Sequence, residues 1–518
     1  MRAAWVAPAV VGVVAVVAYL RTLMPGIAFG DWGEMQTVPH VAGIAHPTGY
    51  PSYIILAGLA ELVPIGSVAF RANLFSAVCV AGALATVTLI ALRLGVRPLI
   101  AIAAGLALGA VGSVWAAATV AEVNPLHLLF AALIVHRTLV WEERRSPADL
   151  AIGGLLVGLA LGNHLLTLFI VPFVALFVVW AGRHELAARP GILVRPIGTL
   201  IVGLAVYLYI PIAASQSPPL PYNHPVTLDG VLWLVSGTQF RGQFDFLSAR
   251  GPGEFVASLP DLWGLVAARA TPVLPILGVA GLAILIVRRP AFGLMCLGIA
   301  LAAIYVWANY LHLEHYLLVP YLVLAIGAAV ALESAARGVA WLFARSGFLR
   351  DARAAGAGPA VATAIGLAIG LAAIGGAATL AAASAPQADR STDRSGQEYV
   401  DAIFKALPPN AAILSYWDAS TPLWHGQLVQ GQRSDVLIVD DTNIVYEGWV
   451  TRERRISSLI CDRPVFILRL GDADLVPTQQ QFRLTQFLTV RVAGGEPTAH
   501  WTRDVYRVEP LDTKVCPG

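Results

Sequence analysis

Two carboxylates lie three residues apart in the segment GDWGEMQ, which follows the first apolar stretch of the chain. If this segment is helical, Asp31 and Glu34 share one face. Two neighbouring acids can hold different pKa values and divide the roles of general base and orienting group. The alternative is that Asp31 only caps a short helix, with Glu34 completing an Asp variant of the capping box.

Further polar residues on the segments expected outside the membrane could bind a ligand. His46 and Tyr50 lie in the irregular turn GIAHPTGYP and offer hydrogen-bond donors. Arg71 lies at the outer end of a predicted span, and a guanidinium there suits a phosphate. Its alternative role is contact with lipid headgroups. The other candidates are Asn73, Glu122, Asn163, His164 and Arg241. For a lone histidine such as His164, packing is the alternative role.

The elements that position these residues must lie in or beside a membrane. Of 518 residues, 57% are hydrophobic and 13% are charged, which excludes a water-soluble enzyme. Among the 34 basic and 32 acidic residues, 31 fall within the last 133 positions. The net charge of +2, with no basic run, excludes nucleic-acid binding. We therefore expect a membrane domain over 1–385 and a soluble domain over 386–518.

Apolar stretches of about 17 to 25 residues are long enough to cross a bilayer as helices. Eleven such stretches occur, at 5–24, 68–92, 98–118, 125–141, 149–163, 165–182, 196–213, 270–287, 291–309, 315–335 and 358–381. Ten spans is the alternative, because 149–182 is interrupted only at Gly162-Asn163-His164. With the N-terminus inside, 15 of the 20 arginines of the membrane domain fall in inside loops, as the positive-inside rule favours. Eleven spans then place the C-terminal domain outside.

Two further outside segments belong to the membrane domain. The segment 25–67 contains an apolar run, 52–63, that is too short to span and is expected to lie along the interface. The segment 214–269 is rich in proline and aromatic residues, which suggests a folded lid on the membrane surface.

The tail from about 386 shows a different pattern. Short β-rich runs at 411–415, 435–439 and 464–470 alternate with helix-like stretches, which predicts a small α/β domain with a parallel sheet. Cys461 and Cys516 both lie in this tail, where a disulfide is allowed, and we expect them to pair. Cys79 and Cys296 lie in spans as core residues. The cysteines and histidines show no metal-binding spacing.

The chain resembles the membrane O-mannosyltransferase family typified by the endoplasmic-reticulum enzyme that mannosylates Ig-like domains of plexin receptors. The resemblance rests on GDWGEMQ, GIAHPTGYP, FRANLFSA, AEVNP, GLALGNH, YLYIPIAAS and, in the tail, ILSYWDASTPLWHGQLVQGQRSDVLIV. It implies the glycosyltransferase-C fold: a polytopic α-helical membrane enzyme of about eleven transmembrane helices, here with a C-terminal extracytoplasmic α/β domain. The chain departs from the family pattern with HPTGYP in place of HPPGYP, and in AEVNP, where an aromatic residue commonly follows Glu-Val.

The resemblance also implies a reaction. A sugar, expected to be mannose, passes from a polyprenyl-phosphate donor to Ser or Thr of an exported protein, with Asp31 as general base and Glu34 as second member. A hydroxyl nucleophile needs such a base, and the phosphate leaving group needs a cation more than an acid. Arg71 and Arg241 are the candidate cations, with His46 and His164 as further donors. In-line attack would invert the anomeric centre. We expect no cofactor and no metal.

The implied location is the bacterial cytoplasmic membrane, with the active site and the C-terminal domain on the extracytoplasmic face. Two alternative functions remain open. One is a transporter or flippase of lipid-linked sugar, although such proteins usually show internal repeats or midplane charges. The other is a transferase to a lipid or glycan acceptor, which the sequence does not distinguish from a protein acceptor.

Overall fold

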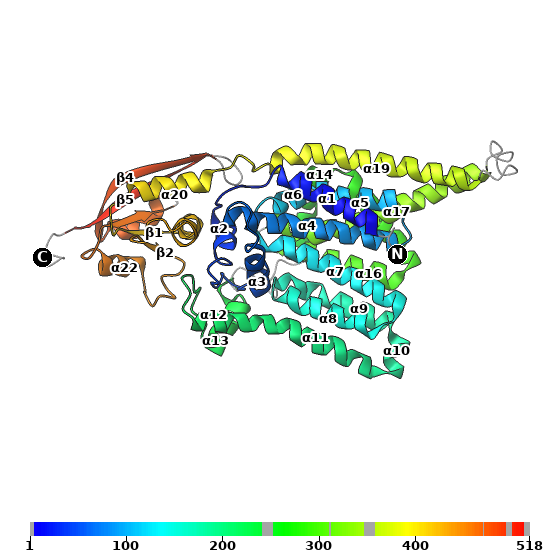
Figure 1. Ribbon diagram of the computed structural model, residues 1–518, viewed down its shortest axis with the longest axis horizontal. Coiled ribbons are helices and arrows are strands. Elements are labelled where there is room, and N and C mark those ends of the chain that lie inside the picture. The colour runs from blue at the N-terminus through cyan, green and yellow to red at the C-terminus, as the bar shows by residue number, and fades with distance from the viewer. Residues whose placement is uncertain are drawn as a thin grey trace.

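The computed structural model describes residues 5–240, 252–309, 312–345, 358–469, 471–493 and 500–511. A body of long helices is joined at one end by a smaller unit that contains the sheet (Figure 1). The body is formed by α1 (Val6–Leu20), α4 (Val68–Arg93), α5 (Pro98–Ala110), α6 (Gly112–Ala118), α7 (Val123–Arg144), α8 (Pro147–Leu161), α9 (Val171–Ala181), α11 (Val194–Leu204), α14 (Pro252–Ala270), α15 (Val273–Arg288), α16 (Pro290–Asn309), α17 (Leu318–Arg345) and α19 (Gly358–Ala388).

Six helices of the described residues are long and apolar enough to cross a membrane, or up to eight if each bent pair is one span. The bent pairs are α5 with α6, at 73°, and α14 with α15, at 110°. Three further predicted spans coincide with shorter apolar helices, at Val6–Leu20, Pro147–Leu161 and Leu165–Ala181. A polytopic helical protein is therefore confirmed, whereas the number eleven stays a prediction.

Close helix packing in the body depends on small residues. Helices α15 and α17 approach so closely that a Cβ atom on Gly281 would collide with the carbonyl group of Gly327. Gly278 meets the same helix at Leu324. Small side chains let two backbones approach in this way, which favours helix association where burial of apolar surface in lipid contributes little.

The loops of the helical body gather at two ends. Ion pairs join loops that the sequence places inside, including Arg93 with Glu143, Arg289 with Glu142, and Arg97 and Arg337 with Glu333. At the other end, Arg269 pairs with Glu314, which also accepts a hydrogen bond from Ser113. This sorting agrees with the predicted order of inside and outside loops.

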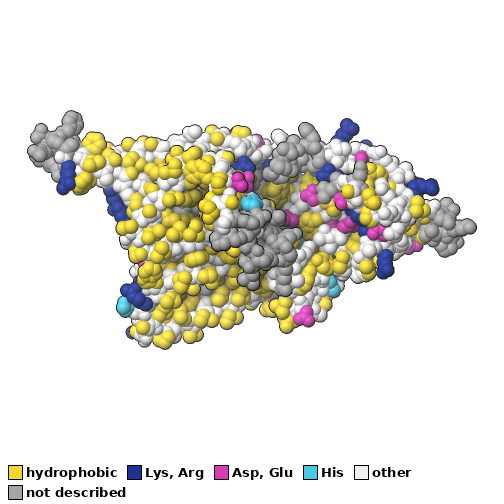
Figure 2. Space-filling view, turned by 180° about the vertical axis from the view of Figure 1, so that it is seen from behind, with side chains coloured by type: hydrophobic (Ala, Val, Ile, Leu, Met, Phe, Trp, Pro, Cys, Tyr) yellow, Lys and Arg dark blue, Asp and Glu magenta, His cyan; other side chains and the backbone are white. Residues whose placement is uncertain are grey.

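The surface between the two ends is hydrophobic. Figure 2 shows apolar side chains spread over the helical body, whereas acidic side chains gather on the sheet unit. Exposed members of this surface include Val13, Leu176, Ile201, Val279 and Leu371. A contiguous apolar surface of this extent fits contact with a lipid bilayer.

Shorter elements lie beside the sheet unit, at the same end of the body (Figure 1). They are α2 (Gly30–Thr37), α3 (Pro51–Ala60), α12 (Tyr209–Ser215) and α13 (Leu228–Val235). Helix α3 falls in the apolar run that was expected at the interface. Helix α10 (Arg183–Ala188) lies at the opposite end.

The sheet unit is an α/β fold with the strand order β2-β1-β3-β5-β4. Its strands are β1 (Ala412–Ser415), β2 (Leu437–Asp440), β3 (Val465–Leu468), β4 (Phe482–Ala493) and β5 (His500–Pro510), and its helices are α20 (Ser395–Ala406), α21 (Trp417–Trp424), α22 (Arg452–Leu459) and α23 (Val476–Gln479). The first three strands pair in parallel, as predicted. The sequence analysis did not predict β4 and β5, which form an antiparallel pair beside β3.

The sheet unit and the first outer segment share a core. Ile27 is buried among Tyr399, Ile403 and Phe466 of the sheet unit. A Cβ atom on Gly396 would collide with the Ile27 carbonyl group, so the two backbones are in direct contact. The unit is therefore fixed to the membrane end by packing as well as by its covalent link.

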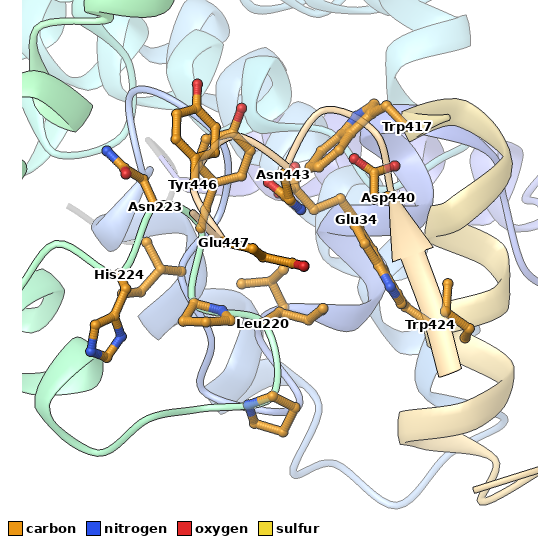
Figure 3. A pocket seen from close by; sticks show the side chains of 16 residues that line it. Glu34, Leu220, Asn223, His224, Trp417, Trp424, Asp440, Asn443, Tyr446 and Glu447 are labelled. Carbon is orange, nitrogen blue, oxygen red and sulfur yellow. The ribbon is translucent and has the colours of Figure 1, made fainter. Parts of the chain in front are cut away.

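A small cavity of about 280 Å³ also lies at this junction, between the segment 219–224 and the sheet unit (Figure 3). Within the sheet unit, Cys461 is in a disulfide. Cys516, the partner that the sequence predicts, lies outside the described residues. Cys79 and Cys296 are free and buried in the helical body.

Candidate active site

Asp31 does not cap its helix. Helix α2 begins at Gly30, its N-cap residue is Phe29, and that end receives no side-chain capping hydrogen bond. Asp31 and Glu34 both belong to the helix, one turn apart, but their surroundings differ. The Asp31 side chain is 60% exposed, whereas that of Glu34 is 2% exposed. The capping interpretation is therefore wrong, and the two carboxylates have the unequal environments that divided roles require.

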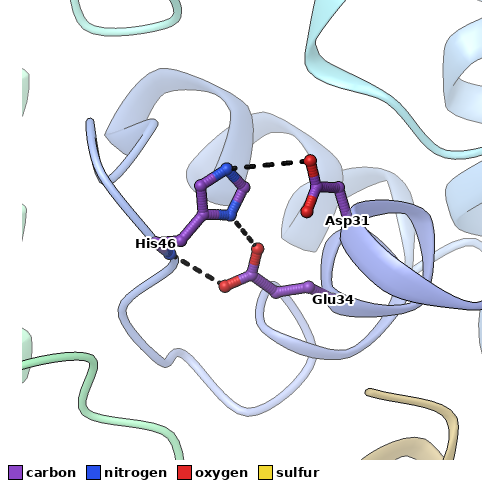
Figure 4. A group of neighbouring side chains, drawn as sticks. All are labelled: Asp31, Glu34 and His46. Atoms are coloured by element: carbon purple, nitrogen blue, oxygen red, sulfur yellow. Dashed lines mark hydrogen bonds and ion pairs between the residues drawn. The ribbon is translucent and has the colours of Figure 1, made fainter. Parts of the chain in front are cut away.

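Glu34 is bound to His46 (Figure 4). One Glu34 oxygen accepts the backbone N–H of His46 at 2.8 Å, and the other pairs with the ring atom Nδ1. Although burial opposes the charge, the carboxylates of Glu34 and Asp31 raise the pKa of His46 to about 9. His46 is therefore an imidazolium at neutral pH, paired with the Glu34 carboxylate.

The other edge of the His46 ring faces Asp31 and Tyr50. Its Nε2 atom lies 4.0 Å from Asp31 Oδ2 and 3.1 Å from the Tyr50 hydroxyl group. The indole N–H of Trp417, from the sheet unit, donates to Asp31 Oδ1 at 2.9 Å. Asp31 is thus oriented from both sides while its carboxylate stays exposed.

Helix α2 is held in place by helix α21 and the turn that follows it. A Cβ atom on Gly33 would lie 2.8 Å from Thr421 Oγ1, and one on Gly30, whose φ is +58°, would lie 2.8 Å from Asp418 Oδ1. The Thr37 hydroxyl group lies 3.2 Å from His425 Nδ1. Only glycine allows this close approach of the two helices.

Asp31, His46 and Tyr50 line a cavity of about 670 Å³. An apolar wall is formed by the short helix η2 (Leu165–Phe169), which precedes α9, through Leu165, Leu166, Leu168 and Phe169. Polar side chains from several elements complete it, namely Glu122, Asn124, His164, Tyr222, Gln239, His315, Tyr316, Trp417 and Thr442. The cavity therefore joins an exposed carboxylate to an apolar wall.

Three other predicted site residues, Asn73, Glu122 and Asn163, hold the surrounding segments together through hydrogen bonds, and Glu122 also lines the cavity. Asn73 accepts from Gln36 and from the Ala121 backbone, which ties α4 to the first outer segment. Both Glu122 oxygens are occupied, one by the Trp32 indole and the other by Val123 N–H and Asn124. Asn163 donates to the Val123 carbonyl group.

His164 lines the cavity and also shapes it. Its Nδ1 atom accepts the Leu166 N–H at 3.1 Å, which begins the short helix η2 (Leu165–Phe169). Because Nδ1 is the acceptor, the proton of the neutral ring belongs on Nε2. His164 can therefore donate one hydrogen bond to a ligand.

The structure does not bring Arg71 to the cavity. Its guanidinium donates to the Val63 carbonyl group at 3.2 Å. Burial raises the pKa of Glu61 to about 8, and the charge of Arg71 opposes this shift. Arg241, the other candidate cation, lies outside the described residues.

Asp31, Glu34 and His46 could also be metal ligands, since one ligand atom from each lies within 4.8 Å of the others. The donor set of two carboxylates and an imidazole is suitable in type. However, Nδ1 of His46 is engaged by Glu34, and Nε2 lies 3.1 Å from the Tyr50 hydroxyl group.

The sequence analysis did not assign Trp417, Tyr222 or Gln239 to the site. Trp417 lies in the tail segment that carries the family resemblance, which was the available signal. Tyr222 and Gln239 share no pattern of spacing with the other site residues, so only the fold brings them to the cavity.

The fold is similar to that of solved structures of two other proteins. ArnT from Cupriavidus metallidurans bound to undecaprenyl phosphate aligns over 98% of this chain and 99% of its own, with a TM-score of 0.60 and 14% identity. The archaeal oligosaccharyltransferase AglB from Archaeoglobus fulgidus, in complex with an inhibitory peptide and a dolichol-phosphate, aligns over 83% of this chain and 64% of its own, with a TM-score of 0.51 and 12% identity. These likenesses confirm the glycosyltransferase-C type of fold.

The sequence comparisons point to one family within this class. Residues 31–187 match the N-terminal domain of Protein O-mannosyl-transferase TMEM260. The mouse protein of that name is 31% identical over 224 residues, which are 41% of this chain. The match spans about a third, 32%, of the mouse protein's length. The predicted resemblance to the membrane O-mannosyltransferase family is thereby confirmed.

Proposed function

We propose that this protein transfers a sugar, mannose, from a polyprenyl-phosphate donor to a Ser or Thr hydroxyl group of an exported protein. The observation that carries the proposal is the exposed Asp31 carboxylate at a 670 Å³ cavity with an apolar wall. A lipid-phosphate sugar has a polar head and an apolar tail, and this cavity offers both environments.

In the proposed reaction, Asp31 is the general base. The acceptor oxygen forms a bond to the anomeric carbon as its proton passes to the Asp31 carboxylate. The bond from that carbon to the phosphate oxygen breaks, and polyprenyl phosphate leaves with the electron pair. Attack from the face opposite the phosphate inverts the anomeric centre.

Glu34 serves the base indirectly. By holding His46 charged, it places an imidazolium 4.0 Å from the Asp31 carboxylate, where the ring helps to orient that carboxylate. The donor phosphate is assigned to the same cavity, where His46, His164 and His315 can supply hydrogen bonds or charge. No cofactor is part of this proposal.

Two features favour transfer over transport of the lipid-linked sugar. The site lies at the end of the helical body, beside the sheet unit, rather than halfway along it (Figure 1). The base is fixed by a side chain of that unit, Trp417, which a transport path would not need. The proposed location is the extracytoplasmic face of a bacterial cytoplasmic membrane.

The test is incubation of the purified protein with polyprenyl-phosphate mannose and host periplasmic extract, followed by mass spectrometry of the protein fraction. The proposal expects Ser or Thr peptides that gain one hexose. Hexose gained only by a lipid or glycan fraction would change the acceptor. A donor that is neither consumed nor bound would remove the proposed function.

A further inference from the structure

A second cavity, separate from the one assigned to the donor, lies between the outer segment 219–224 and the sheet unit. It measures about 280 Å³ and is formed by Leu220 and Asn223 on one side and by Asp440, Asn443 and Glu447 on the other (Figure 3). Glu34 also lines it. The sequence analysis assigned no role to this junction.

Two buried acceptor atoms of the lining residues have no donor among the described residues. Asp440 is only 2% exposed, and its Oδ2 atom has no hydrogen-bond partner among the described residues. Its other oxygen accepts the Thr442 N–H at 2.9 Å. Asn443 Oδ1 is buried and unpartnered in the same way. Because unpaired buried acceptors are costly, the cavity favours a ligand that brings N–H donors.

The charge of the lining indicates a cationic ligand. Asp441, the neighbour of Asp440, is paired with Arg452 and Arg469, whereas the described ion pairs do not include Asp440. Glu34 and Glu447 also line the cavity, but both already have charged partners, His46 and Arg455. Among the described lining residues, His224 is the only basic one. A Lys or Arg side chain would therefore satisfy both the charge and the hydrogen bonds.

The two cavities share a wall. Tyr222 and Trp417 line both, and their rings meet edge to face with centroids 5.8 Å apart. The two carboxylates lie on different sides of this wall. Glu34 lines the smaller cavity, whereas Asp31 and His46 line the larger one. A ligand in the smaller cavity would thus be directly beside the proposed base.

We propose that the smaller cavity binds the acceptor polypeptide through a Lys or Arg side chain close in sequence to the hydroxyl group that receives the sugar. This inference rests on the proposed function. Aromatic rings and the prolines 219 and 221 give the cavity flat apolar sides, against which the stem of a long basic side chain packs. The cavity then selects acceptors, while the larger one holds the donor.

The experiment compares synthetic Ser/Thr peptide pools that differ only in carrying Lys or norleucine near the hydroxyl residue. With polyprenyl-phosphate mannose, we expect the wild type to use the Lys pool with at least a ten-fold lower KM. Asp440→Asn and Glu447→Gln should raise that KM about ten-fold and leave the donor KM as in the wild type. Glu398→Gln, an exposed change on α20, is the matched control.

Charge reversal separates selection from folding. Glu447 is exposed, so Glu447→Lys should fold and shift the preference toward peptides with Asp or Glu in place of Lys. Equal use of Lys and norleucine pools by the wild type would overturn the inference while leaving the proposed function intact. Transfer only to a glycan or lipid fraction would overturn it as well. No transfer from the donor to any acceptor would instead count against the proposed function.

Discussion

The indole N–H of Trp417 donates a hydrogen bond to the Asp31 carboxylate across 386 positions of sequence, at 2.9 Å. The two residues come from different units of the molecule, one from the α21 helix of the sheet unit and the other from helix α2 beside the membrane body. The general base that we propose is therefore oriented by the part of the chain that the sequence analysis considered accessory.

Removing that hydrogen bond should slow transfer. Trp417→Phe keeps an aromatic ring against His46 and Tyr222 but removes the donor to Asp31. A hydrogen bond to a charged group contributes about 1.5–3 kcal/mol, so turnover should fall by roughly ten- to a hundred-fold. The measurement is kcat for hexose transfer, with Trp449→Phe as the control in the same unit. Equal kcat in both variants would remove the orienting role of Trp417.

Asp31→Asn tests the base itself. Asn can accept the Trp417 N–H but cannot take a proton, so turnover should fall by roughly 10²- to 10⁴-fold with the thermal midpoint unchanged. Glu34→Gln should reduce turnover less, because Glu34 acts through His46. An Asp31→Asn enzyme with near wild-type turnover would end the general-base assignment. Both variants are compared at matched expression.

The His46 ion pair makes stability depend on pH. The pKa of His46 is raised to about 9 from its ordinary 6.5, so the pair's contribution to the free energy of unfolding is complete below about pH 6.5. That contribution is lost as the pH rises through about 9. The thermal midpoint of the wild type minus that of His46→Gln should therefore shrink from pH 7 to about pH 10. His184→Gln, an exposed change at the opposite end, should show no such trend. A constant difference for His46→Gln would contradict the raised pKa.

Contact between α2 and α21 should tolerate no side chain at Gly33. A Cβ atom there would meet Thr421 Oγ1 at 2.8 Å and the Ala28 carbonyl group still closer. We expect Gly33→Ala to lower the free energy of unfolding by about 1–3 kcal/mol. It should also reduce turnover, because it displaces Asp31. Gly376→Ala, at a site with nothing within 4 Å, is the control for the substitution. The readouts are the thermal midpoint and kcat. If Gly33→Ala changed neither of them, the two helices would have adjusted to the added methyl group.

Transfer should not need a divalent metal. Glu34 and His46 use their ligand atoms on each other, so a cation would have to break their ion pair. We expect hexose transfer to survive excess EDTA at the wild-type rate. Loss of activity with EDTA, followed by recovery with Mn²⁺ or Mg²⁺, would instead make Asp31, Glu34 and His46 a metal centre.

Sequence reasoning reached the parts of the fold that local pattern controls. Apolar length predicted the positions of the membrane helices, and β-rich runs predicted strands β1, β2 and β3 within about two residues. The hairpin of β4 and β5 was missed because its strands mix charged and apolar residues, as in FLTVRVA and WTRDVY. The number of spans depends on helices of 15 to 17 residues, which length alone cannot classify.

The candidate site was predictable only in part for a similar reason. Asp31 and Glu34 are neighbours on one helix, so their spacing already indicated a pair. Trp417 and His315 reach the cavity through tertiary packing, which leaves no periodic pattern in the sequence. Arg71 was assigned from its charge at a span end, but the nearby Val63 carbonyl group and Glu61 give that guanidinium local partners.

The burial of Ile27 in the core of the sheet unit has a consequence for how the molecule is made. During synthesis, the acid pair and the helical body emerge long before Trp417 and helix α21. Helix α2 has no packing surface on that side until the tail has folded against it. An unfinished chain thus holds Asp31 without the Trp417 hydrogen bond that orients it. The proposed base is therefore oriented only after the sheet unit, made later than the helical body, has folded against helix α2.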